Sequence, residues 1–460
     1  MIAIGGGTTP FPGNLALGAT GSPELARRAG QAMGMELAAM GVNVNFAPVT
    51  DVNANPQNPV IGTRSFGEDP TLVARLSAAM VDGLQSAGIA ATAKHFPGHG
   101  DTDGDTHHGP AVVHHDRQHL DKVAIPPFLA AIQSNVRLIM TAHVAFHALD
   151  GGMGLPATLS PTLLRGLLRG ELGFEGVIVS DALNMAAIAQ GERLVVDAIA
   201  ATAAGVDLLL LHDDPLVHQS VYTGLLHATQ RGLLSGEEVL ASAQRVLALK
   251  RWLAERPQPS LDIVGCAEHQ RLAFEIGARS ITLVRDEQRQ LPLSLSADQR
   301  IAVIVPQPID LTPADTSSYE TCMLAQFLRR YHRAVDEFVV PHHPSQSDII
   351  ALLQQIERYD LAIIGTINAL GQPGQVEMVK RILATPVPAI VAALRMPGDL
   401  QAFPEAPAYI CTYSLLAPSM EALAQALFGH IPFVGRLPVA IPGFYPVGYR
   451  LEETGAYQVL

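Results

Sequence analysis

The segment KHFPGHGDTDGDTHHG at 94–109 is the densest group of ionisable side chains in this sequence. It combines one lysine, four histidines and three aspartates with glycines and a proline that exclude a helix. Three interpretations compete: a solvated polar loop, a metal site, or a centre for acid–base chemistry. Because so many ionisable groups follow a short apolar run, a plain solvated loop is disfavoured.

A metal site would use nitrogen and oxygen ligands from this segment. The candidates suit zinc or a similar ion: His95, His99, Asp101, Asp105 and His107. The usual H-x-H or H-x-H-x-D-H spacing is absent. We therefore predict no metal and no other cofactor.

Acid–base chemistry would depend on Asp105 and His107. The two residues are two apart, so in an extended loop both side chains lie on one side. A carboxylate there can hold the imidazole by one nitrogen, fix its tautomer and raise its basicity. Such a histidine can donate a proton and later withdraw one near neutral pH.

A second candidate segment is GVIVSDALNM at 176–185, an apolar run that ends in Ser180-Asp181. The Asp181 carboxylate is either the cap of a following helix or a nucleophile. The residues alone leave both alternatives open.

A third candidate is Arg64, which lies in a loop punctuated by Gly and Pro at 55–70. Its guanidinium either pairs with Glu68 or Asp69, or offers a fork of donors to a ligand hydroxyl or carbonyl.

The first 255 residues alternate two patterns that would position these groups. Apolar faces of helical period predict helices at 22–41, 69–88, 119–135, 160–174, 185–204, 215–232 and 236–255. Continuous apolar runs, typical of strands buried on both faces of a parallel sheet, lie at 41–49, 88–96, 136–144, 176–183 and 205–211. Polar residues follow most of these strands: Asp51, Lys94, His95, His143 and Asp181.

Five clear strands are too few for a closed barrel of eight, so two architectures compete. One is an open doubly wound α/β sheet, and the other is a (β/α)8 TIM-like barrel missing its first strands, with MIAI at 1–4 as a candidate for one more. We predict the barrel, because polar residues follow the strands generally rather than one switch point.

A proline-rich linker at 253–262 divides the chain. We predict a catalytic barrel domain over 1–257 and a smaller C-terminal α/β sandwich domain over 258–460. The second domain has predicted strands at 280–286, 300–307, 336–341, 360–366, 388–394 and 407–413. Its strand ends have few ionisable residues, so we expect a structural role or a contribution at an interface.

Composition limits the class of partner. The 460 residues include 30 Lys+Arg and 43 Asp+Glu, a formal charge of −13, which argues against nucleic acid or an anionic membrane. No apolar run reaches the length of about 18 residues that a membrane helix needs. Three separated cysteines form neither a CxxC site nor a disulfide framework. The expected partner is a small molecule, with no prediction of oligomeric state.

Together the candidate segments resemble the β-N-acetylglucosaminidases of glycoside hydrolase family 3. The resemblance is found, in the family's order, in FAPVTDVNANPQNPVIGTRSFGEDP (46–70), KHFPGHGDTDGDTH (94–107), MTAHV (140–144) and VSDALNM (179–185). It spans the barrel and extends weakly into the second domain through SITLVRD and RLPVAIPGFYPVGY.

The resemblance implies a retaining glycosidase with Asp181 as nucleophile and His107, held by Asp105, as acid/base. An imidazole then replaces the acid/base carboxyl of the usual two-carboxylate scheme. Three further residues are implied to bind the hydroxyls of N-acetylglucosamine: Arg64, Lys94 and His95.

The start of the chain departs from the family. Members have further barrel strands and a D-x-E-G-G-R-V type segment, which contributes an Asp and an Arg to sugar binding, before the region that matches PFPGNLALGAT. We expect the chain without them to be less stable and to bind sugar more weakly. MIAIGGGTTPFPG lacks signal-peptide features. This favours the cytoplasm, and secretion would need a signal upstream of Met1.

The implied activity is removal of terminal β-linked N-acetylglucosamine from peptidoglycan fragments or chitooligosaccharides. A phosphorylase is an alternative, because a histidine acid/base repels an incoming phosphate less than a carboxylate does. A truncated, non-catalytic sugar-binding protein is the alternative from another class, and the presence of Asp181, Asp105 and His107 argues against it. A metallohydrolase would lose activity to a chelator.

Overall fold

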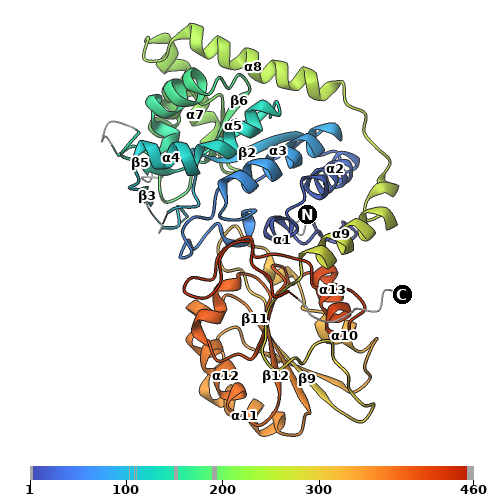
Figure 1. Ribbon diagram of the computed structural model, residues 1–460. Coiled ribbons are helices and arrows are strands. Elements are labelled where there is room, and N and C mark those ends of the chain that lie inside the picture. The colour runs from blue at the N-terminus through green and yellow to red at the C-terminus, as the bar shows by residue number, and fades with distance from the viewer. Residues whose placement is uncertain are drawn as a thin grey trace. The chain divides into compact units, whose positions relative to one another are not determined.

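The computed structural model describes residues 4–102, 104–107, 109, 111–149, 154–188 and 194–452. Contacts divide the chain into two compact units. Figure 1 shows the chain coloured by residue number. The barrel unit comprises 26–65 and 69–264, and the sandwich unit comprises 1–25, 66–68 and 265–460. These contact groups differ from the predicted domain ranges 1–257 and 258–460, which stay a prediction.

The barrel unit contains a curled sheet of five parallel strands in the order β1-β2-β4-β6-β7. The strands are β1 (Val44–Asn45), β2 (Ala90–Phe96), β4 (Leu138–Thr141), β6 (Val177–Ala182) and β7 (Leu208–Leu210). Each lies inside a predicted apolar run, and the partial TIM-like barrel is confirmed. Within the described part of the chain β1 and β7 are the sheet edges. Residues 1–3 of the candidate strand at 1–4 lie outside the described residues.

Helices alternate with these strands as the periodicity predicts. They are α2 (Pro23–Ala39), α3 (Pro70–Ser86), α4 (Arg117–Val123), α5 (Ile125–Gln133), a π-helix (Thr162–Glu171), α6 (Leu194–Ala204), α7 (Pro215–Gln230) and α8 (Gly236–Ala254). Local chemistry sets several starts: Asp69 accepts a hydrogen bond from the Thr71 amide ahead of a proline at the first helical position, and Asp214 does the same for Leu216.

Four short elements that the periodicity did not predict lie near the strand ends. The strands β3 (Ala111–Val113) and β5 (Val144–Phe146) pair in parallel, and the 3-10 helix η3 (Ala157–Leu159) contacts β5. A second 3-10 helix, η2, spans Gly62–Arg64. These elements flank the loops after β1, β2 and β4, the loops that contain the candidate residues.

Buried apolar side chains hold the barrel strands in register. Ala90, Leu138, Met140, Val177 and Val179 form one cluster with Leu249 of α8. Because the strands are parallel, their carboxyl ends all meet at one edge of the sheet. Asp51, the Lys94-His95 pair, His143 and Asp181 are thereby brought to that edge.

The sandwich unit is built on a six-stranded sheet in the order β10-β9-β11-β12-β13-β8. Only β8 runs antiparallel, at one edge. The strands are β8 (Thr282–Asp286), β9 (Ile301–Pro306), β10 (Val335–Val340), β11 (Leu361–Thr366), β12 (Ala389–Ala393) and β13 (Ala408–Cys411). All six correspond to strands predicted from the sequence.

Helices cover both faces of this sheet, which makes the unit a three-layer α/β sandwich (Figure 1). One core holds side chains of α1 (Asn14–Thr20), α11 (Gln346–Ile356) and α12 (Pro373–Leu383). The opposite core holds side chains of α9 (Ala267–Ser280), α10 (Leu324–Leu328) and α13 (Ala417–Leu427). No helix in the described ranges has both the length and the hydropathy needed to cross a bilayer.

Candidate active site

Asp51 is the anchor of the site, and it is fully buried. Its Oδ1 accepts hydrogen bonds from the backbone amides of His95, at 3.1 Å, and His99, at 2.7 Å. Its Oδ2 accepts one from Nδ1 of His95 at 2.8 Å. Burial by itself would raise the pKa of Asp51, but the adjacent His95 and the hydrogen bonds that Asp51 accepts lower it below its usual value.

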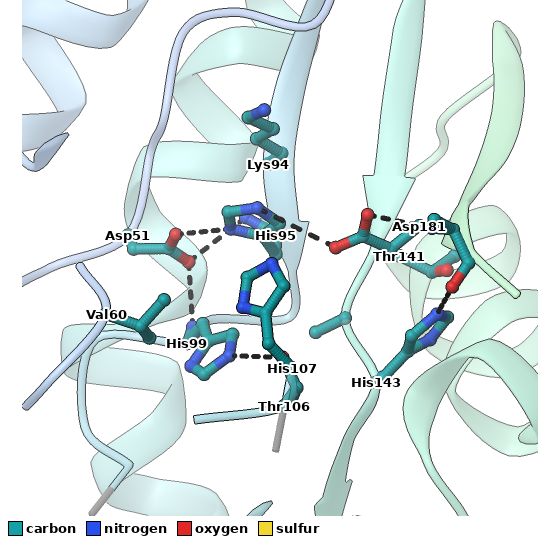
Figure 2. Close-up of polar contacts among 12 residues, drawn as sticks. Asp51, Val60, Lys94, His95, His99, Thr106, His107, Thr141, His143 and Asp181 are labelled. Atoms are coloured by element: carbon teal, nitrogen blue, oxygen red, sulfur yellow. Dashed lines mark hydrogen bonds and ion pairs between the residues drawn. The ribbon is translucent and has the colours of Figure 1, made fainter. Parts of the chain in front are cut away.

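His95 is oriented by this contact. Burial lowers the pKa of His95, so the ring is neutral at neutral pH, with its one proton on Nδ1 facing Asp51. Nε2 is then an acceptor, and it lies 4.0 Å from Oδ2 of Asp181. Figure 2 shows this line of side chains from Asp51 through His95 to Asp181.

Asp181 is the next-to-last residue of β6. One of its carboxylate oxygens is hydrogen-bonded to the backbone, and the other faces His95 in the site. Oδ1 accepts a hydrogen bond of 2.8 Å from the Ala182 amide. Burial would raise the pKa of Asp181, but His95, His143, the Ala182 amide and Lys94 together lower it. The carboxylate is therefore ionised at neutral pH, as a nucleophile must be.

The loop after β2 is held against Asp51 by close backbone packing and by His99. A side chain on Gly100 would place a Cβ 1.8 Å from the carbonyl oxygen of Val52, so only glycine fits there. Both ring nitrogens of His99 are bonded, Nδ1 to Thr102 Oγ1 at 2.9 Å and Nε2 to Thr106 Oγ1 at 3.1 Å. Burial lowers the pKa of His99 to about 4, so this imidazole is a neutral structural bridge.

Asp105 and His107 form a hydrogen-bonded pair in the same loop. Oδ1 of Asp105 accepts from Nδ1 of His107 at 2.6 Å and from the His107 amide at 2.9 Å. The Asp105 side chain is 8% exposed and that of His107 is 24% exposed, so a ligand can reach the imidazole. The spacing argument from the sequence thus matches the geometry, while the catalytic roles stay predictions. Asp103 and His108 of this segment lie outside the described residues.

His143 follows β4, and both of its ring nitrogens have hydrogen-bond partners. Nε2 donates to the carbonyl oxygen of Ala182 at 3.0 Å, and Nδ1 lies 2.7 Å from Thr158 Oγ1. Burial lowers the pKa of His143, against the opposing effects of the Asp181 charge and the hydrogen bond to Ala182. Nε2 of His95 and Nε2 of His107 make no hydrogen bond to the described residues, and the His107 side chain is the more exposed, at 24% against 6%. The imidazole of His107 is therefore the more accessible to a ligand.

Lys94 and Arg64 supply positive charge beside these groups. Burial and the neighbouring Arg64 guanidinium lower the pKa of Lys94 to about 8, against the opposing effect of Asp181 and Asp51. Arg64 ends η2 and donates to the Val60 carbonyl at 3.3 Å. The structure thus gathers all three predicted sugar-binding residues near Asp181 or near one another, and their role stays a prediction.

Three functional-site residues escaped assignment from the sequence: Asp51, His99 and His143. Only their position in the sequence indicated that they could belong to the site, because each follows a predicted strand or lies in the 94–109 segment. Their contacts join residues up to 48 apart in sequence, so spacing alone could not reveal them.

We expect Asp51→Ala to destabilise the barrel unit by about 3 kcal/mol or more, because it leaves buried donors of His95 and His99 unsatisfied. Denaturant unfolding would measure the loss. Asp213→Ala, at an exposed aspartate, is the matched control and should unfold like the native protein. Equal midpoints for the two variants would contradict the anchoring role.

Acid should remove the same stabilisation. The pKa of Asp51 is lower in the folded protein than in the unfolded chain. Its contribution to stability is therefore complete above the unfolded-state pKa and is lost as pH falls through the folded-state pKa. The stability difference between native protein and Asp51→Ala should therefore shrink on acidification.

A partial (β/α) barrel with an ionised carboxylate and an imidazole–carboxylate pair at the carboxyl ends of its strands has the layout of a barrel enzyme. Residues 1–249 match the sequence pattern of the glycosyl hydrolase family 3 N-terminal domain. The chain belongs to glycoside hydrolase family 3.

Similar proteins cover nearly the whole chain. A β-hexosaminidase A of Pseudoalteromonas piscicida is 32% identical over 94% of this chain and 80% of its own length. A β-N-acetylglucosaminidase/β-glucosidase of Cellulomonas fimi is 30% identical over 93% of this chain and 79% of its own. The solved structure of a family 3 β-N-acetylglucosaminidase from Paenibacillus sp. str. FPU-7 superposes with a TM-score of 0.89 at 37% identity, covering 95% of this chain and 83% of that one.

Proposed function

We propose that this protein hydrolyses terminal β-linked N-acetylglucosamine from oligosaccharides such as peptidoglycan fragments or chitooligosaccharides, with retention of anomeric configuration. The observation that supports it most is the presence in one site of an ionised carboxylate, Asp181, and of an imidazole, His107, that Asp105 holds by Nδ1. The β-hexosaminidase and β-N-acetylglucosaminidase names of the similar proteins support the choice of sugar.

In the first step Oδ2 of Asp181 attacks the anomeric carbon. Oδ1 is held by the Ala182 amide, so the carboxylate is fixed in one orientation. As the bond to Oδ2 forms, the bond to the glycosidic oxygen breaks, and His107 delivers the proton on Nε2 to that oxygen. Asp105 stabilises the protonated imidazole through Nδ1.

In the second step water displaces Asp181 from the sugar. His107, now neutral, takes a proton from the water through Nε2, and the oxygen of that water bonds to the anomeric carbon. Two displacements at the same carbon restore the original configuration. The sugar hydroxyls are proposed to bind the acceptor Nε2 of His95 and the donors of Lys94 and Arg64.

Product analysis tests the proposal. An aryl β-N-acetylglucosaminide is incubated with the full chain, and proton NMR follows the first sugar released, before mutarotation. The expected product is the β-anomer of N-acetylglucosamine, and the matching β-glucoside is the control for the acetamido group. An α-anomer as first product, or no release by folded protein, would overturn the assignment.

The same assay in phosphate buffer separates hydrolysis from phosphorolysis. The neutral imidazole of His107 in the second step does not repel an anion, so phosphate could compete with water as the acceptor of the sugar. Free N-acetylglucosamine at all phosphate concentrations is the expected result. A sugar 1-phosphate would replace the hydrolase by a phosphorylase.

Binding of substrate should weaken at alkaline pH. Lys94 has a pKa of about 8, so its ammonium becomes neutral as pH rises through that value and no longer makes a charge-assisted hydrogen bond to a sugar hydroxyl. We expect KM, and the Kd of a GlcNAc-derived inhibitor, to rise about tenfold across this range. Isothermal titration with the inhibitor would measure it. Lys94→Gln should bind weakly at every pH and lack the step, whereas a flat native profile would remove Lys94 from the binding site.

A further inference from the structure

We propose that Asp101, His115 and His119 form a binding site for zinc or a chemically similar divalent ion, beside the catalytic loop. Nε2 of His115 lies 2.8 Å from Oδ2 of Asp101, and Nε2 of His119 lies 3.1 Å from the same oxygen. One ligand atom from each of the three side chains lies within 4.8 Å of the other two. Two imidazoles thus converge on a single carboxylate oxygen.

The donor set fits zinc. Two imidazole nitrogens and one carboxylate oxygen are ligands that zinc takes in proteins, and three protein ligands leave a fourth position for water. Ligands at a tetrahedral zinc lie about 3.3 Å apart, so the two nitrogen–oxygen separations need to open by only a few tenths of an ångström. The rings of His115 and His119 stack with centroids 3.9 Å apart and planes 20° from parallel, and the Nε2 atom of each contacts the same oxygen of Asp101.

The three side chains also have the exposure that metal entry requires. His115 is exposed, and Asp101 and His119 are partly buried. An ion would bind the Nε2 lone pair of each neutral ring, and the single proton of that ring then resides on Nδ1.

The site joins two segments that meet only in the folded chain. Asp101 directly follows Gly100, whose tight approach to Val52 fixes the path of the loop. His119 belongs to α4, and His115 lies just before it. A bound ion would therefore pin the loop that contains Asp105 and His107 to α4.

This site differs from the metal site weighed on sequence grounds. Of those five candidate ligands only Asp101 takes part, since His95, His99 and His107 make the contacts described above with Asp51, Thr102, Thr106 and Asp105. The proposal also stands apart from the proposed glycosidase activity, because zinc binding is measured without substrate.

Equilibrium dialysis and isothermal titration with zinc chloride test the proposal on the full chain after removal of metals by chelator. We expect one tight equivalent per chain. Asp101→Asn, His115→Gln and His119→Gln should each weaken that equivalent tenfold or more. His114→Gln is the matched control: its exposed imidazole adjoins His115 in sequence but stacks on His147 instead.

A second readout reports the geometry. Cobalt(II) substituted for zinc should show the intense visible absorption of a low-coordinate site in the native chain and in His114→Gln, and lose it in the three ligand variants. Hydrogen exchange of the His99–Thr102 amides should slow when zinc binds the native chain and stay unchanged in Asp101→Asn.

The outcomes separate clearly. No tight equivalent in the native chain, or the same affinity in all three ligand variants as in His114→Gln, would overturn the site. Thermal melting of each variant verifies its fold, and if one variant does not fold, the other two decide. Loss of zinc binding with unchanged product formation would leave the proposed function intact, and inactive protein that binds zinc would leave the metal site intact.

Discussion

Replacing Asp181 by Asn should lower kcat/KM on an aryl β-N-acetylglucosaminide by at least about three orders of magnitude. The amide keeps the shape of the side chain but has no negative charge with which to attack the anomeric carbon. The melting temperature should change little, because Oδ1 can still accept the Ala182 amide and no buried partner is lost. Steady-state kinetics at several pH values, with a melting curve, is the measurement, and no pH should restore the rate.

A substitution with a smaller side chain tests more directly whether Asp181 is the nucleophile. Asp181→Ala leaves a space in which azide can replace the missing nucleophile, and the product is then an α-glycosyl azide because only one displacement occurs. Asp197→Asn, a carboxylate on α6 outside the site, is the matched control and should keep native activity. Near-native turnover in Asp181→Asn, or a β-azide from Asp181→Ala, would show that another group is the nucleophile.

The second large effect concerns proton transfer by His107. His107→Ala should slow cleavage of substrates with poor leaving groups by about 10²–10⁴-fold, because the departing oxygen no longer receives a proton. A dinitrophenyl glycoside needs no proton on departure, so its first step should be affected much less. Pre-steady-state and steady-state rates across a series of leaving groups would give the dependence.

Asp105 provides an internal comparison. Because Asp105 acts through the imidazole, Asp105→Ala should lower kcat/KM less than His107→Ala does. The pH dependence of the rate should shift in Asp105→Ala but persist. His227 is an exposed histidine on α7, so His227→Ala is the control for the loss of an imidazole outside the site and should keep native activity. Equal losses on good and poor leaving groups in His107→Ala would make His107 a binding residue instead.

The element pattern was predictable from sequence because it depends on local periodicity. Each strand of the five-stranded barrel sheet falls within a predicted apolar run, and each of the six sandwich strands matches a predicted strand to within a few residues. The caps of α3 and α7 appear as Asp-Pro pairs. Buried parallel strands must be apolar on both faces, and this property is visible without the fold. The short β3–β5 pair was not predictable, since three residues contain too little periodicity.

Contacts over long sequence separation were not predictable. The helix α1 packs into the core of the sandwich unit with Leu15 and Ala16, although nearly 250 residues separate it from α9, the first helix after the linker. The apolar face of a helix indicates that the helix packs against another element, but it does not show which element that is.

At the site, the sequence by itself determined the local pair and the candidate groups. Asp105 and His107 are two apart, so their contact follows from chain geometry over a few ångströms. Asp181 and Lys94 were placed by the rule that parallel strands present their carboxyl ends together.

Tertiary structure alone decided which chemistry each group can perform. Asp51 meets His95 and His99 across more than forty residues, and burial there, not residue type, sets which carboxylates are ionised and which imidazoles are neutral. The same holds for Asp101, His115 and His119, whose ligand atoms converge only when the loop after β2 folds against α4. Desolvation and charge–charge interactions act through space, so a linear sequence contains the groups and only the fold supplies the distances between them.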